Sequence, residues 1–60
     1  MDPDENLRQQ LRLAKKLLDA WDNETRIDRD VAIRLAERVE ALDEWLSKGG
    51  FLPKRWDHDR

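Results

Sequence analysis

The sequence predicts an all-α fold: an antiparallel two-helix hairpin with a C-terminal tail packed back on it. Two apolar stripes recur at steps of three and four residues, the spacing of one face of a helix. They mirror each other across a polar break, which predicts that they pack face to face. The first stripe contains Leu7, Leu11, Ala14, Leu18 and Trp21, and the second contains Ala32, Leu35, Val39, Leu42 and Leu46.

Folding the chain back near Arg26 would bring the two stripes into register. Leu7 would then lie opposite Leu46, and Leu11 opposite Leu42. The remaining expected pairs are Ala14 with Val39, Leu18 with Leu35, and Trp21 with Ala32.

Local signals set the ends of both helices. Asp2 is expected to cap a helix over residues 3–22, with Pro3 at its first position and Glu5 completing a capping box. A turn over 23–27 leads to a second helix over 28–48, capped by Asp28 or alternatively by Thr25. Gly49 and Gly50 end that helix and begin the tail over 49–60, because glycine accepts the left-handed conformation that closes a helix.

The chain is short for a protein that folds alone. It has 60 residues and no cysteine, so disulfides cannot stabilise it. We therefore expect the single domain, residues 1–60, to form a homodimer with a four-helix bundle. The residues expected to self-associate are Leu13, Leu17, Ala20, Val31 and Trp45. Phe51, Leu52 and Trp56 are expected to pack the tail onto the hairpin or to contact a partner.

Charge argues against a polyanionic or membrane partner. Charged residues make up 43% of the chain, but 12 basic and 14 acidic residues leave a net charge of only -2. No apolar run approaches the roughly 20 residues that cross a bilayer. The acidic start of the sequence does not resemble a secretion signal, so a cytoplasmic location is expected.

One basic set supports an alternative function. Arg8, Arg12, Lys15 and Lys16 share a face of the first predicted helix and could follow the phosphates of a nucleic acid. The alternative is therefore a dimeric nucleic-acid-binding regulator. Glu5, Asp19 and Asp22 interrupt the same face, which favours an ordinary solvated surface and makes nucleic acid an unlikely partner.

No catalytic, cofactor-binding or metal-binding set can be assembled from the remaining residues. Ser47 lies at a predicted helix end, and His58 lies near the chain end between two aspartates. Four carboxylates project outward from the second predicted helix without a histidine at metal-binding spacing; they are Asp30, Glu37, Glu40 and Glu44. We therefore predict a protein that is not an enzyme and holds no cofactor.

The segment over residues 41–56 carries a resemblance. A leucine-containing helix there ends on Gly49 and Gly50 and is followed by Phe-Leu-Pro and Trp56. This ending resembles that of short hypothetical proteins of actinobacteria and their phages. The segment over residues 32–39, with Arg34-Leu35-Ala36-Glu37, is similar to the same proteins, so the resemblance covers roughly the second half of the chain. The resemblance implies an accessory protein of actinobacterial or phage origin, in the host cytoplasm if phage-encoded; it implies no activity and no functional residues. From the sequence as a whole we expect a protein that acts by binding itself or another host or phage protein.

Overall fold

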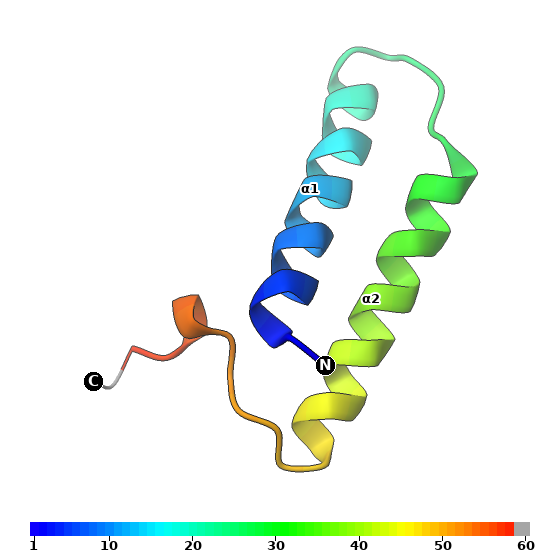
Figure 1. Cartoon of the computed structure of the whole chain (residues 1–60). Coiled ribbons are helices and arrows are strands. Elements are labelled where there is room, and N and C mark those ends of the chain that lie inside the picture. The colour runs from blue at the N-terminus through cyan, green and yellow to red at the C-terminus, as the bar shows by residue number, and fades with distance from the viewer. Residues whose placement is uncertain (59–60) are drawn as a thin grey trace.

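The computed structural model describes residues 1–58, which form two long helices and one short one (Figure 1). Helix α1 spans Pro3–Asp22, α2 spans Arg29–Ser47, and the 3-10 helix η1 spans Lys54–Trp56. The two long helices are antiparallel and pack against each other, and the described residues contain no strand. The all-α hairpin is therefore confirmed. Helix α1 has the expected bounds, and α2 lies one residue inside the expected 28–48 at each end.

Aspartate side chains cap both N-termini. The Oδ1 atom of Asp2 accepts hydrogen bonds from the backbone N–H groups of Asp4 at 3.0 Å and Glu5 at 3.2 Å. Asp28 caps α2 by accepting from the N–H of Asp30 at 2.9 Å. The Glu5 carboxylate does not complete the expected capping box, because it pairs with Arg8 at 2.8 Å instead.

Helix α2 ends in a Schellman motif. The N–H of Gly50 donates to the carbonyl of Trp45 at 2.9 Å, and the N–H of Gly49 donates to the carbonyl of Leu46 at 3.1 Å. Gly49 has a φ of 89°, in the left-handed region where glycine has no steric penalty. Helix α2 therefore ends at the predicted glycines, and Gly49 has the left-handed conformation expected there.

Helix α1 ends in the same motif without a glycine. The N–H of Thr25 donates to the carbonyl of Ala20 at 2.9 Å, and the N–H of Glu24 donates to the carbonyl of Trp21 at 3.2 Å. Glu24 occupies the left-handed position with a φ of 56°. A residue with a Cβ pays a steric penalty there, so this turn is strained. The Thr25 hydroxyl donates to Ala20 and does not cap α2.

The expected pairing of the apolar stripes is wrong. Leu11, Leu18 and Val39 are exposed, with Leu18 at 62% of its full accessible surface. On α1, the residues that face α2 are those directly before the exposed leucines. Gln10 precedes Leu11 and donates from Nε2 to the carbonyl of Arg38 at 3.3 Å. Leu17 precedes Leu18 and is half-buried. Each helix is thus rotated so that one edge of its apolar arc faces its neighbour.

The residues expected to self-associate are all partly buried within a single chain: Leu13, Leu17, Ala20, Val31 and Trp45. Both apolar stripes contribute to the burial, because Leu7 and Leu42 of the stripes expected to pair are buried, at 4% and 3% exposure. Amide side chains share the contact, since buried Asn6 accepts from Gln10 Nε2 at 2.7 Å. Self-association through these five residues stays a prediction.

The register also differs from the expected one. Gln10 lies level with Arg38, whereas the expected pairing would place it level with Asp43. Helix α2 is therefore shifted along the hairpin axis relative to the expected register, and its first turn lies short of the last turn of α1. This shift leaves Trp21 beside the loop, where its side chain is 74% exposed.

The tail folds back onto the start of α1 through residues other than those expected. Pro53 is fully buried, and the N–H of Lys54 donates to Asp4 Oδ1 at 2.6 Å, so η1 lies beside the first turns of α1 (Figure 1). Phe51, Leu52 and Trp56 all remain exposed. The tail is thus held against α1 by a proline and a backbone hydrogen bond, while Phe51, Leu52 and Trp56 keep between 44% and 66% of their surface exposed.

One aromatic contact joins the tail to the end of α2. The rings of Trp45 and Phe51 meet edge to face with centroids 5.4 Å apart, and Trp45 Nε1 donates to the carbonyl of Phe51 at 3.0 Å. Gly50 lies directly against the Trp45 ring, since a Cβ built on it would come within 2.3 Å of ring atoms. The glycine therefore makes room for the ring.

Candidate functional site

The two sides of the hairpin have different chemistry, and helix geometry shows why. Four exposed apolar residues, Leu11, Leu18, Trp21 and Val39, each directly follow a residue of the helix–helix contact, so they lie about 100° further around their helices. Leu18 follows Leu17 on α1, and Val39 follows Arg38 on α2. On antiparallel helices the same sense of rotation leads to the same side of the pair. These four side chains therefore share one side, whereas the exposed Ile33 lies on another side of α2.

We call this side the apolar face. It comprises the exposed Leu11, Leu18 and Val39, with the half-buried Ala14, Ala32 and Leu46 between them. Trp21 continues the row of α1 at the loop end. The tail closes the other end, where Lys54 and Arg55 line a hollow together with Leu7.

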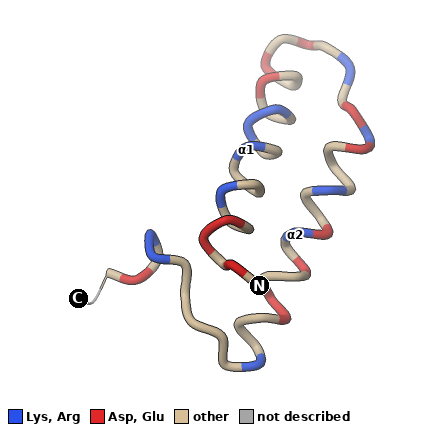
Figure 2. The backbone as a smooth tube through the Cα atoms, viewed as in Figure 1, with Lys and Arg blue, Asp and Glu red and all other residues tan. Residues whose placement is uncertain are grey.

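The residues that precede the contact residues lie on the opposite side; they include several basic residues and also Asp19, Asp30 and Glu37. Arg12 precedes Leu13, Lys16 precedes Leu17, and Arg34 precedes Leu35. Figure 2 shows Lys and Arg in the middle of both helices. They line a groove of about 230 Å³, which we call the basic groove; its lining residues are Gln9, Arg12, Leu13, Lys16, Arg34 and Arg38.

The structure divides the four basic residues expected to contact nucleic acid. Arg8 pairs with Glu5 at 2.8 Å and Lys15 pairs with Asp19 at 3.6 Å, so these two are engaged on the surface of α1. Arg12 and Lys16 enter the basic groove. Arg34 and Arg38 join them from α2, and sequence reasoning missed these two. Arg34 directly precedes a residue of the helix–helix contact, and Arg38 lies within that contact. These positions can be recognised only once the rotation of the two helices is known.

Most cations of the basic groove have no carboxylate partner. Within residues 1–58, no ion pair within 4.0 Å involves Arg12, Lys16 or Arg34. Arg38 donates from Nε to the Gln9 side-chain oxygen at 2.5 Å, a neutral acceptor that orients the guanidinium and leaves its charge uncompensated. The groove therefore concentrates positive charge on a chain whose net charge is -2.

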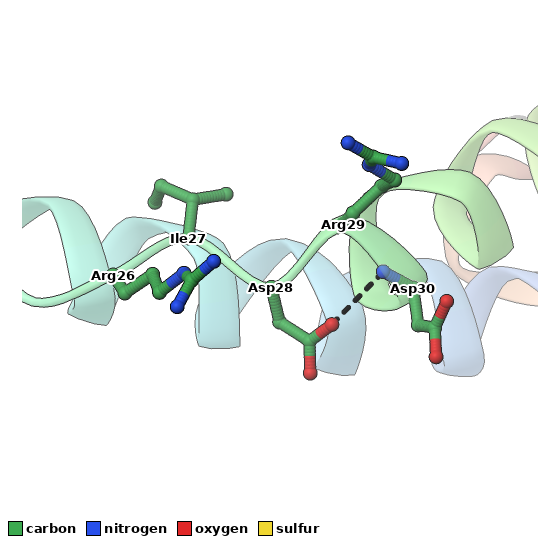
Figure 3. Close-up of a pocket in the computed structure, with 5 residues that line it drawn as sticks. All are labelled: Arg26, Ile27, Asp28, Arg29 and Asp30. Carbon is green, nitrogen blue, oxygen red and sulfur yellow. Dashed lines mark hydrogen bonds between the residues drawn. The ribbon is translucent and has the colours of Figure 1, made fainter.

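A further hollow lies along the loop before α2. Its volume is about 640 Å³, and five consecutive residues line it, from Arg26 to Asp30. Figure 3 shows that the Asp28 carboxylate is occupied in capping the helix and that the side chains of Arg26 and Arg29 do not converge. A concavity formed by one short segment has no facing wall, so it offers little to hold a ligand.

No arrangement for metal binding is found within residues 1–58. No group of three or more histidine, cysteine or acidic side chains lies close enough together to hold an ion. His58 is exposed, near the limit of the described residues. Over the same range, neither long helix has the uninterrupted apolar length that crossing a bilayer requires.

Comparison with known proteins shows no relationship. No protein-family model matches the chain, and no curated protein or solved structure is detectably similar to it. The fold and the two sides define a two-helix hairpin with an apolar face and a basic groove. Any function must be argued from these residues.

Proposed function

We propose that the chain is a small non-enzymatic interaction protein whose apolar face binds a second copy to form a four-helix bundle. The observation that carries this proposal is the size of the core. Apart from two prolines, Leu7 and Leu42 are the only buried apolar side chains in residues 1–58, at 4% and 3% exposure. Four apolar side chains on one side of the hairpin stay exposed to solvent: Leu11, Leu18, Trp21 and Val39.

The chemistry of small domains favours a second copy as the occupant of this face. Chains below about 70–80 residues are usually stabilised by disulfides, a structural metal, cyclisation or association. The chain has no cysteine, and residues 1–58 contain no metal-binding cluster. Association would supply the apolar burial that a single hairpin lacks.

The composition of the apolar face also suits a symmetric contact. A twofold dimer places the same patch on both subunits, so leucine and valine would cover leucine and valine. Ala14 and Ala32 lie between the larger side chains and allow helices to approach closely. Trp21, about three-quarters exposed, adds roughly 150 Å² of aromatic surface at the loop end.

The resemblance of residues 41–56 to short actinobacterial and phage proteins supports an accessory role in the cytoplasm. In that role, the exposed Phe51, Leu52 and Trp56 would contact a host or phage protein, because the dimer uses the helices and not the tail.

Light scattering after size exclusion tests the dimer directly. We expect twice the 7.2 kDa chain mass at high concentration and dissociation on dilution. Leu18→Glu removes about 1–2 kcal/mol of burial per subunit and should weaken the dimer roughly 30- to 700-fold. Ile33→Glu is the matched control, since Ile33 is exposed on another side of α2.

Two results would overturn the proposal. One is a monomer mass at every concentration with full helicity retained, because the hairpin would then be stable without a partner. The other is equal weakening by Leu18→Glu and Ile33→Glu, because the contact would then not lie on the apolar face.

A further inference from the structure

We infer that the basic groove binds the sugar–phosphate backbone of a nucleic-acid strand. Four cations converge on it from two helices: Arg12 and Lys16 from α1, and Arg34 and Arg38 from α2. On each helix the two cations are four residues apart, so they lie one turn apart along the groove. The site is thus a channel with two cations on each wall.

The carboxylates near the channel are engaged elsewhere or lie outside it. Glu5 is held by Arg8 and also accepts from Gln9 at 3.0 Å, and Asp19 is paired with Lys15. Glu37, which lies between Arg34 and Arg38 in sequence, is exposed and does not line the groove. The cations are therefore free to bind an external anion.

The channel extends toward the loop. Lys16 also lines a second hollow of about 230 Å³, with Leu17, Ala20 and Val31 on its walls and Arg26 at its loop end. Asp28 lines the same hollow, but its carboxylate caps α2. Lys16 therefore connects the groove to a hollow that holds one further cation, Arg26, and one carboxylate, Asp28.

A linear polyanion fits this shape better than a small anion or a surface. Guanidinium groups present planar pairs of donors that match phosphate oxygens, and three of the four groove cations are arginines. The cations line a concave channel between two helices, whereas a bilayer surface would contact a convex face. Since no side chain in the channel is aromatic, base stacking is not available, and recognition would be independent of sequence.

The groove lies on the opposite side of the hairpin from the apolar face. Binding there requires only one hairpin, so it does not depend on the proposed dimer. The overall charge of -2 means that attraction is confined to the groove. This predicts moderate affinity that falls steeply with salt.

Fluorescence anisotropy with labelled single-stranded DNA, duplex DNA and duplex RNA tests the inference. Titrations between about 50 and about 200 mM salt give the dependence of affinity on salt. With four phosphate contacts, the logarithmic slope should be about -3 for a single strand and about -3.6 for duplex DNA. A single strand that binds most tightly would indicate that the channel encloses the backbone.

Paired variants locate the contact. Arg12→Gln with Arg34→Gln should reduce the salt slope by about 2 and the affinity roughly tenfold or more. Arg8→Gln with Lys15→Gln changes the net charge equally but removes cations already paired with carboxylates, so it should have little effect. All four side chains are exposed, and circular dichroism verifies that both variants fold.

Arg34→Glu, a single reversal in the groove, should abolish measurable binding. The inference is overturned if the wild type does not bind at about 50 mM salt, or if the two double variants weaken binding equally, because the charge would then act diffusely. Equal or tighter binding to anionic lipid vesicles, with the same loss in the groove variant, would also overturn it in favour of a membrane surface.

Discussion

Replacing Gly50 by alanine tests the packing of the tail on α2. The φ angle of Gly50 is not positive, so an added Cβ affects stability through its contacts. That Cβ would come within 2.3 Å of Trp45 Nε1 and Cε2, far inside van der Waals distance. The indole must therefore move, and its movement breaks its hydrogen bond to Phe51.

The expected cost follows from these contacts. Overpacking by one methyl group typically costs about 1–3 kcal/mol. The Trp45–Phe51 hydrogen bond and the edge-to-face pair each contribute about 1 kcal/mol. Because Phe51 is exposed, each contribution lies at the low end of its range. We therefore expect Gly50→Ala to lower the free energy of unfolding by about 2–3 kcal/mol in total. For so small a domain this lowers the melting temperature by roughly 10–20 °C.

Urea unfolding followed by circular dichroism, at one fixed protein concentration, measures this cost. In a Trp45→Ala background the added methyl group meets no ring, so the effect of Gly50→Ala should nearly vanish. Gly49→Ala is the control: its site is open but has a φ of 89°, so its cost of about 1–2 kcal/mol should persist in both backgrounds. A Gly50→Ala cost below about 0.5 kcal/mol, or one unchanged without Trp45, would refute the reasoning.

Two further substitutions and one deletion test other features. Glu24→Gly should raise the free energy of unfolding by about 0.5–1 kcal/mol, because it relieves the left-handed strain at the end of α1; thermal unfolding would show no gain if the strain is absent. Asp28→Ala should cost about 1 kcal/mol in urea unfolding through loss of the α2 cap, with the exposed Asp43→Ala as a neutral control. Deleting residues 51–60 should lower the melting temperature substantially, because it uncovers Leu7 and leaves Asp4 without Lys54; an unchanged melting temperature would contradict this.

The helix ends could be predicted from the sequence because the signals are local. Asp2, Asp28 and the Gly49–Gly50 pair each act on backbone groups within a few residues, and the structure shows each of them as expected. The end of α1 carried no such signal. Glu24 takes the position that glycine usually fills, so its conformation is imposed by the surrounding hydrogen bonds.

The rotation of the helices could not be predicted in the same way. Periodicity locates the centre of an apolar arc, but a neighbour can pack against either edge of a wide arc. In the structure the contact includes Gln10, whose amide bonds a backbone carbonyl of α2. A pattern of apolar residues gives no weight to such an amide. The contact in the structure is therefore displaced by one residue around each helix from the predicted contact.

The basic groove depended on that same rotation. The sequence places Arg12 and Lys16 on one helix face together with Arg8 and Lys15, and nothing in the spacing separates the two pairs. The separation comes from Glu5 and Asp19, which engage the outer pair, and from α2, which supplies Arg34 beside the inner pair. The candidate site is thus a property of the register between helices.

The hairpin is thin: its Cα atoms extend only 13 Å along the shortest axis, so the same two helices form both sides. A partner that fixes the spacing of α1 and α2 on the apolar face also fixes the distance between the two rows of cations behind it. The proposed dimer and the proposed anion binding would then be thermodynamically linked, although neither requires the other. By reciprocity, whatever factor dimerisation added to anion affinity, the anion would add to dimerisation.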